Sequence, residues 1–160
     1  MQITPQFPLQ NVNTRVSATL FPDPLQHRDE IVLRHGNETE VVWCDKRGAV
    51  DPDYSGAREK AGGLVWCDLY VCWSPQGTYL TTFHRKGLAI WGSNEFVKQG
   101  RFAHSDVKEC RYTRSEEYML SSNLREGDDR AHIVWDVRSG RSVGRVQIHS
   151  TEFGNSRSAK

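Results

Sequence analysis

The four cysteines of this 160-residue chain, Cys44, Cys67, Cys72 and Cys110, are the side chains that could bind a soft metal ion or form disulfides. A structural zinc site needs thiolates paired two to four residues apart in turns. Four residues separate Cys67 from Cys72, but the apolar run around them predicts a strand, which would send the two thiols to opposite faces. We therefore predict reduced core thiols, no metal site and no cofactor.

Histidine and carboxylate side chains could also carry out acid–base catalysis, but their positions in the sequence argue against it. The six histidines have no evident catalytic partners, and His84 falls at a predicted hairpin edge, a surface or contact position. The acidic pairs Glu116-Glu117 and Asp128-Asp129 lie in turn-like polar stretches, where carboxylates are ordinarily solvated. Phosphate-binding loops, nucleophile elbows and metalloprotease motifs are absent from the sequence. We predict that the protein is not an enzyme.

Basic side chains suggest a binding surface of limited extent. The chain carries 21 Lys+Arg against 20 Asp+Glu, a balance that excludes a generally basic nucleic-acid clamp but not local patches. A polar segment of net charge −4 over residues 115–136 precedes one of net charge +4 over residues 138–160. The basic segment could follow a phosphate backbone or serve solubility. The candidate RNA or partner contacts are Arg85, Lys86, Arg138, Arg141 and Arg145.

The elements that would position these side chains are short strands. Residues 64–73 are almost wholly apolar and predict a strand buried on both faces, whereas the polar, Gly-rich residues 44–63 predict a long loop. Helical periodicity is not evident, so we predict an all-β fold. Further expected strands are Glu30–Arg34, Glu40–Trp43, Thr78–Phe83 and Leu88–Trp91, with turns at His35–Asn37 and Ser74–Gly77.

The strands repeat. The β-branched–Trp pairs that end in Trp43, Trp91 and Trp135 are spaced 48 and 44 residues apart, and Trp73 recurs as Tyr112 after 39 residues. A period of 40–45 residues that ends in Trp-Asp, here Trp135-Asp136, is typical of WD-repeat propeller blades. A blade-opening His fits His104, which we expect to hydrogen-bond toward Ser121 or Ser122 and toward the Trp135 indole. The predicted structural blade positions are Trp43, Trp73, Trp91, His104, Trp135 and Asp136.

Residues 66–92 go beyond a generic repeat. Trp66, Tyr70-Val71, Trp73-Ser74-Pro75, Gly77-Thr78-Tyr79-Leu80, Thr82-Phe83-His84, Gly87, Ala89 and Trp91-Gly92 together resemble the propeller of the b subunit of eukaryotic translation initiation factor three. Phe102-Ala103-His104 resembles the opening of that family's next blade, and Asp29 to Asp45 resembles its preceding hairpin. The resemblance covers roughly residues 20–147.

The resemblance implies a noncatalytic scaffold of the translation initiation machinery. Family members join other factor-three subunits (a, g and i) and place them on the small ribosomal subunit, with ribosomal RNA contact as a further implication. The chain departs from the full-length plan, since neither a ribonucleoprotein motif nor a C-terminal helical pattern is present. The alternative is a general WD-repeat protein–protein adaptor without a ribosomal role.

The length of the chain bears on its completeness. We expect an extended lead-in at 1–28, blades over 29–147 (29–45 partial, 64–100 and 101–147) and a loose polar tail at 148–160. About two to three blades result, and closed propellers need at least four. The chain is therefore expected to be an incomplete part of a larger propeller, or a short relative completed by another chain. A membrane-length apolar run and a signal peptide are absent, so we expect a cytoplasmic protein.

Overall fold

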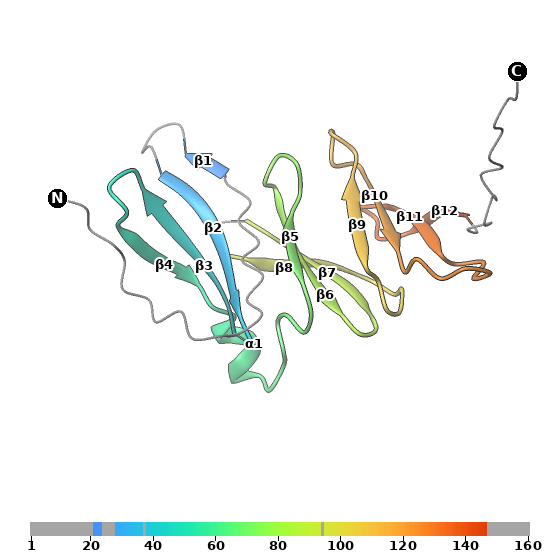
Figure 1. The fold of residues 1–160 in the computed structure, drawn as a ribbon, viewed down its shortest axis with the longest axis horizontal. Helices are drawn as coiled ribbons and strands as arrows, with labels where there is room; N and C mark the ends of the chain where they lie inside the picture. The colour runs from blue at the N-terminus through green and yellow to red at the C-terminus, as the bar shows by residue number, and fades with distance from the viewer. Residues whose placement is uncertain (1–20, 24–27, 37, 94, 147–160) are drawn as a thin grey trace, which may run out of the picture. The chain divides into compact units, whose positions relative to one another are not determined.

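The computed structural model of the chain describes residues 21–23, 28–36, 38–93 and 95–146. The predicted lead-in up to residue 20 and the predicted tail lie outside these residues. The strands are β1 (Phe21–Asp23), β2 (Arg28–His35), β3 (Glu38–Asp45), β4 (Val50–Tyr54), β5 (Val71–Trp73), β6 (Tyr79–His84), β7 (Gly87–Gly92), β8 (Val97–Phe102), β9 (Glu109–Tyr112), β10 (Tyr118–Ser122), β11 (His132–Asp136) and β12 (Ser142–Val146) (Figure 1).

These strands form three antiparallel sheets of four strands each, in which every strand pairs with its neighbours in the sequence. We call them the first sheet (β1–β4), the second sheet (β5–β8) and the third sheet (β9–β12). A four-stranded antiparallel meander is the form of a propeller blade. The predicted all-β fold with propeller-like blades is therefore confirmed.

The second and third sheets repeat each other residue by residue. Trp73 pairs with Leu80 in the second sheet, and Tyr112 pairs with Met119 in the third, so the 39-residue offset seen in the sequence is also the offset in strand register. Leu80 in turn pairs with Trp91, as Met119 pairs with Trp135.

The turns after β5 and β9 show one departure from this repeat. Gly77 has φ 76° in the first of these turns, a left-handed conformation that suits glycine. Its counterpart Glu116 adopts φ 59° in the second turn and is buried. The Glu116 carboxylate accepts a hydrogen bond of 2.6 Å from the backbone N–H of Gln76 in the neighbouring turn, and Gln76 Nε2 donates to the backbone carbonyl of Arg114. The two turns are thus joined directly.

The first sheet extends beyond the partial blade predicted over 29–45. It gains β1 before that range and β4 after it, so the prediction of a long loop over 44–63 is wrong. A short helix, α1 (Ala57–Ala61), also lies in that stretch. Strand β4 could not be predicted because it is an end strand of polar sequence, Val-Asp-Pro-Asp-Tyr. Its side chains are largely exposed, so they show no hydrophobic alternation.

The prediction of one buried strand over residues 64–73 is also wrong. The strand β5 contains Val71–Trp73, and the residues before it form an irregular segment. Leu64 and Val65 are exposed in this segment, while Trp66 and Cys67 are buried. The Trp66 ring lies edge-on to Trp91, with 5.5 Å between the ring centroids. The apolar character of the run therefore reflects a segment that covers one face of the second sheet.

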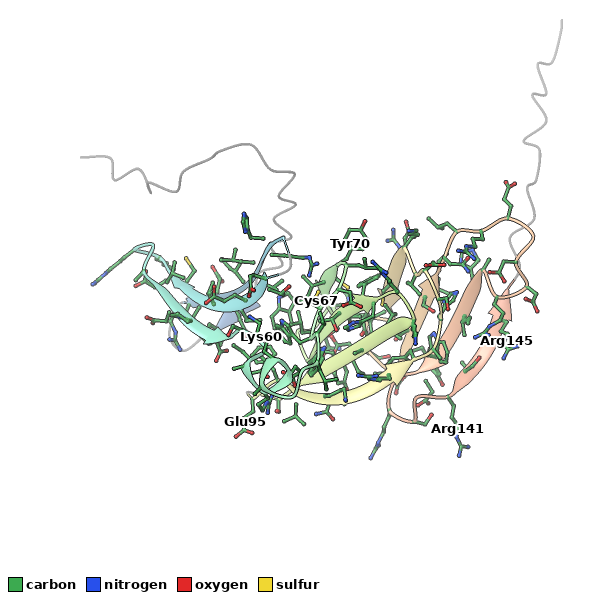
Figure 2. All side chains as sticks on the ribbon, turned by 90° about the horizontal axis from the view of Figure 1, so that it is seen from below. Lys60, Cys67, Tyr70, Glu95, Arg141 and Arg145 are labelled. Atoms are coloured by element: carbon green, nitrogen blue, oxygen red, sulfur yellow. The ribbon has the colours of Figure 1, made fainter. Side chains whose placement is uncertain are left out.

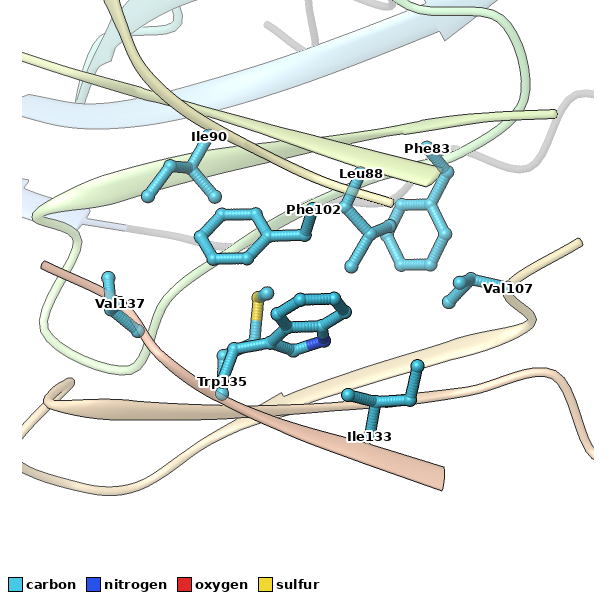
Figure 3. Packing of buried hydrophobic residues seen from close by; sticks show 9 residues of the cluster. Phe83, Leu88, Ile90, Phe102, Val107, Ile133, Trp135 and Val137 are labelled. Carbon is cyan, nitrogen blue, oxygen red and sulfur yellow. The ribbon is translucent and has the colours of Figure 1, made fainter. Parts of the chain in front are cut away.

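The hydrophobic core of this part of the molecule lies between the second and third sheets (Figure 3). Trp135 of the third sheet packs edge-on against Phe102 of the second, with the ring centroids 5.4 Å apart. The further members of the cluster are Phe83, Leu88, Ile90, Val107, Met119, Ile133 and Val137. Each blade thus buries a face that it could not cover by itself.

The chain divides into two units, residues 1–56 with the first sheet and residues 57–160 with the other two sheets. Each unit is described by itself below. Within the described residues, the structure contains no helix with the length and apolar character that crossing a membrane would require.

Candidate functional site

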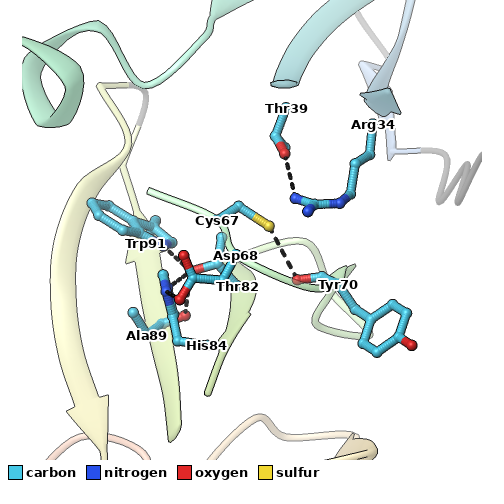
Figure 4. Close-up of polar contacts among 9 residues, drawn as sticks. All are labelled: Arg34, Thr39, Cys67, Asp68, Tyr70, Thr82, His84, Ala89 and Trp91. Atoms are coloured by element: carbon cyan, nitrogen blue, oxygen red, sulfur yellow. Dashed lines mark hydrogen bonds and ion pairs between the residues drawn. The ribbon is translucent and has the colours of Figure 1, made fainter. Parts of the chain in front are cut away.

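The second sheet contains a chain of hydrogen bonds that runs from its core to its surface (Figure 4). Trp91 Nε1 on β7 donates to Thr82 Oγ1 on β6 over 2.8 Å. The Thr82 oxygen lies 2.9 Å from His84 Nε2, and His84 Nδ1 lies 3.2 Å from the Asp68 carboxylate. In the neutral imidazole with Nδ1–H donating to Asp68, Nε2 accepts from the Thr82 hydroxyl. We call this arrangement the second-sheet relay.

A carboxylate, an imidazole and a hydroxyl in this order also occur in nucleophilic catalysis, so the environment of the hydroxyl decides its role. Thr82 has an exposed fraction of 0%. Its oxygen lies within hydrogen-bonding distance of Trp91 Nε1, His84 Nε2 and the Ala89 carbonyl. The hydroxyl accepts from Trp91 Nε1 and donates its single proton to His84 Nε2, while the Ala89 carbonyl lies at the longer distance of 3.5 Å. The geometry fastens two strands and the Asp68 segment together, and it leaves no room for a substrate at the oxygen.

The third sheet contains a shorter version, the third-sheet relay. Trp135 Nε1 donates to Ser121 Oγ over 2.8 Å, and His104 Nδ1 lies 2.7 Å from the same oxygen. The sequence predicts Ser121 or Ser122 for this contact, and the structure places His104 at Ser121. Burial, followed by the nearby charge of Arg130, lowers the pKa of His104, so the ring is held in its neutral form.

The two relays place histidine and acid differently. His84 follows Thr82 on the same strand, whereas His104 enters from the segment between β8 and β9. In the third sheet the nearby Asp128 carboxylate accepts from Asn123 Nδ2 over 2.7 Å and from the backbone N–H of Arg130 over 2.8 Å. Asp128 therefore orders its own loop, and the third-sheet relay includes no acid.

The first sheet lacks the hydroxyl on which both relays depend. In the second sheet, Thr82 pairs with Ala89, which is two residues before Trp91 in the sequence. In the first sheet, the residue that pairs with the position two before Trp43 is Val32. The half-buried Trp43 instead carries the Arg28 guanidinium over its ring, 4.9 Å from the centroid. The predicted blade position Trp43 is therefore held by a cation–π contact.

The remaining predicted blade positions have separate roles. Trp73 is buried on β5 and packs against Phe96, with the ring centroids 6.1 Å apart. Asp136 ends β11, where its Oδ1 accepts from the backbone N–H of Ser139 over 2.7 Å. This hydrogen bond is the main reason that the pKa of Asp136 falls below its ordinary value. Asp136 thus shapes the turn into β12.

The predicted contact residues do not gather into one patch. Arg85 and Lys86 are exposed in the turn between β6 and β7. Arg138 and Arg141 lie in the turn between β11 and β12, which in an antiparallel meander is at the opposite end of the sheet, and Arg145 is on β12 itself. Figure 2 shows Arg141 and Arg145 directed away from the sheets. Strand β8 adds Lys98 and Arg101, and neither β8 nor residues 138–145 include an acid.

Sequence reasoning missed His84 and Asp68. The available signal was the Thr-x-His pair of Thr82 and His84, on a strand that precedes the buried Trp91. The carboxylate of Asp68 comes from a segment 16 residues before His84, and the sequence does not reveal the path of that segment. Among the described residues, no three His, Cys, Asp or Glu side chains gather as a metal site would require.

Comparisons with known proteins relate the chain to one group of translation factors. It is 36% identical over 134 residues to the B subunit of eukaryotic translation initiation factor 3 of Arabidopsis thaliana, a match that covers 79% of this chain and 18% of that protein. The protein of the same name from Nicotiana tabacum is 37% identical over 136 residues, with the same two coverages. That from Xenopus laevis is 34% identical over 113 residues, 69% of this chain and 15% of the relative.

A solved structure supports the fold. A chain described as the crystal structure of the eukaryotic initiation factor superposes with a TM-score of 0.59 at 14% identity, covering 79% of this chain and 31% of that one. At this identity the likeness concerns the fold. No family model matches the chain.

Proposed function

Because this chain is homologous to a stretch of the B subunit of eukaryotic translation initiation factor 3, about a fifth of that protein's length, we propose that it is a noncatalytic scaffold module of the translation initiation machinery. In this role it joins initiation factor three subunits, namely a, g and i, and the small ribosomal subunit, and it works in the cytoplasm. The observation that carries the proposal is the 36% and 37% identity to the plant proteins over 79% of the chain.

Two features of the structure support a noncatalytic role. The Thr82 hydroxyl, which stands in the geometry of a nucleophile, is fully buried and is hydrogen-bonded within its sheet. The third-sheet relay likewise joins strands through a buried Ser121. Both constellations hold blades in shape, so loops, turns and sheet edges remain as surfaces for partners.

Sedimentation of the tagged chain with native small-subunit complexes after crosslinking tests the proposal. We expect the chain to migrate with the small subunit and to bring down other factor-three subunits. A variant with Trp91→Ala, which should disturb the blade, is the matched control and should lose co-sedimentation. Recovery of the wild-type chain wholly in the free fractions would contradict the initiation role and favour the alternative, a general WD-repeat adaptor that binds peptides.

Direct RNA contact is a second candidate function, favoured by the charge of the outer strands. Strands β8 and β12 stand at the ends of their sheets, and with the turn before β12 they carry Lys98, Arg101, Arg138, Arg141 and Arg145 without an acid. Lysine and arginine side chains that contact a nucleic acid neutralise phosphates and release the counterions bound to them.

The RNA candidate predicts a salt-dependent affinity. Replacing Arg138, Arg141 and Arg145 by Ala should weaken binding to a structured ribosomal RNA fragment and reduce the slope of log affinity against log salt by about two to three. Replacing Arg85 and Lys86, at the opposite end of the sheets, is the control and should change the slope less. An unchanged affinity of the triple variant would exclude this surface.

A further inference from the structure

Two cysteines meet where the second and third sheets join. Cys72 is the central residue of β5, and Cys110 lies on β9, the corresponding first strand of the next sheet. Both side chains are half-buried and pack against the core cluster between the sheets. The cysteine pair therefore spans the interface that holds the two blades together.

The register of the strands explains why the two thiols face each other. Thr81 lies directly opposite Cys72 in the pairing of β5 with β6. The Thr81 hydroxyl lies 2.6 Å from Tyr112 Oη, which fastens the second sheet to β9. Cys110 stands two residues before Tyr112 and so projects from the same face of that strand. The Thr81–Tyr112 contact thus places Cys110 beside Cys72, close enough for each thiol to shift the pKa of the other.

The pair is electronically unequal. The hydrogen bond from Cys110 lowers the pKa of Cys72 despite its burial, and the same bond together with burial raises the pKa of Cys110. Cys72 is therefore the thiol that ionises first, with Cys110 as its donor. The thiolate is the nucleophilic form of cysteine.

We propose that Cys72 and Cys110 are a disulfide-forming pair that joins the second and third sheets covalently on reaction with a peroxide. The Cys72 thiolate attacks the peroxide, breaks its O–O bond and becomes a sulfenic acid, and the alkoxide or hydroxide released takes up a proton. Cys110 then attacks the Cys72 sulfur as the thiolate and displaces hydroxide, which leaves as water with the Cys110 proton. Overall, two thiols and one peroxide give one disulfide, one alcohol or water, and one water.

The other two cysteines have different surroundings. Cys67 is buried, and its thiol lies 3.3 Å from the Tyr70 carbonyl, which accepts its hydrogen bond (Figure 4). Cys44 belongs to the first sheet, and its thiol donates to the carbonyl of Asp45 over 3.7 Å. Each is therefore a control residue whose replacement keeps the reactive pair intact.

The experiment measures intact mass and free thiols of the full chain before and after treatment with hydrogen peroxide. In the Cys44→Ser/Cys67→Ser variant, we expect the mass to fall by two hydrogen atoms and both remaining thiols to resist alkylation after denaturation. Adding Cys110→Ser to that variant should stop the reaction at a sulfenic acid on Cys72, which a dimedone reagent captures.

Fragmentation and hydrogen exchange complete the test. A crosslinked peptide that contains Cys72 and Cys110 is expected, together with slower amide exchange in β5 and β9 of the oxidised protein. Two alkylatable thiols after oxidation, or a disulfide between two molecules, would overturn the proposal. Because the Cys44→Ser/Cys67→Ser variant leaves the interface residues in place, its exchange pattern before oxidation also shows whether the fold is intact.

Discussion

The first sheet and the other two sheets use the same tryptophan position in different ways. Trp91 and Trp135 are buried, and each donates its indole N–H to a buried hydroxyl in its own sheet. Trp43 is half-buried and lies beneath the Arg28 guanidinium, and its sheet has Val32 at the strand position where the other sheets have a hydroxyl. The difference teaches that the spacing of the tryptophans marks a blade. Whether the indole N–H is hydrogen-bonded within its sheet depends on the residue at one position of the preceding strand, which is Thr82, Ser121 or Val32 in the three sheets.

The largest expected effect tests this difference directly. Trp135→Ala should cost about 3–5 kcal/mol of unfolding free energy, because it removes a fully packed ring from the core between two sheets. Trp43→Ala should cost less, about 1–2 kcal/mol, because its ring is half-exposed and a cation–π contact contributes roughly 0.5–1 kcal/mol. Urea unfolding gives the values, and amide exchange assigns each loss to its own unit. Equal losses would remove the distinction between the sheets.

Removal of the Ser121 hydroxyl from the third-sheet relay should cause the next largest loss of unfolding free energy. Ser121→Ala leaves the Trp135 N–H and the His104 ring nitrogen without their partner, which costs about 1–3 kcal/mol for buried polar groups. Ser122→Ala is the matched control, since its buried hydroxyl accepts one long bond of 3.3 Å from the Leu124 N–H. The expected cost there is below about 1 kcal/mol. A larger effect at Ser122 would show that the relay does not stabilise this sheet.

The acid of the second-sheet relay should have a smaller effect. Asp68→Asn keeps the shape of the side chain but removes the charge beside His84, whose side chain has an exposed fraction of 21%. A loss of about 0.5–1 kcal/mol is expected, since solvent screens partly exposed pairs. Asp106→Asn, which breaks the exposed ion pair with Arg125, should change stability by less than about 0.5 kcal/mol. Thermal unfolding of the two variants side by side checks the order, which an equal or reversed pair of shifts would contradict.

The two units should also respond to pH with opposite sign. Burial and then the neighbouring Asp53 raise the pKa of Glu30 in the first sheet from 4.5 to about 7. An acid whose pKa rises on folding binds its proton more tightly in the native state, so the first sheet should lose stability as pH rises from 4.5 to about 7. His104 has a lowered pKa, so the third sheet should lose stability as pH falls through 6.5, the ordinary value.

Amide exchange between pH 5 and pH 8, corrected for intrinsic rates, measures both responses in one experiment. Protection of β2 and β3 should fall toward high pH, and protection of β10 and β11 should fall toward low pH. Glu30→Gln should abolish the first trend and leave the second in place. Parallel trends in the two units would show that the titrating groups lie elsewhere.

The sequence predicted the two central strands of the first and second sheets, because these strands carry apolar and aromatic residues that the turns separate clearly. The offset that relates Trp73 to Tyr112 is a property of the sequence that the strand pairing reproduces. Strand β4 could not be predicted in the same way, since an exposed end strand that contains Pro52 has no burial to impose a pattern. The apolar run before Val71 was mistaken for a strand because burial against Trp91 and strand formation favour the same residues.

The relays could be predicted in part. His104 was found because it precedes its sheet in the expected place, and its partner Ser121 was one of two neighbouring hydroxyls. The relay of His84 was missed because its carboxylate comes from the irregular segment before β5. A contact between a strand and a segment of unpredicted path depends on tertiary structure, and no local pattern encodes it.

The turn at Glu116 has a consequence for which sheets pair with each other. A glycine at that position, as in the preceding turn, would relax the backbone, yet a left-handed glutamate stands there and accepts the N–H of Gln76. The buried Glu116 carboxylate is hydrogen-bonded only where the backbone N–H of Gln76 lies beside it. Next to a sheet without such a donor, the carboxylate would be buried without a hydrogen bond. Some local backbone stability is thus exchanged for a hydrogen bond that the neighbouring turn provides, which favours the pairing of the third sheet with the second over other pairings.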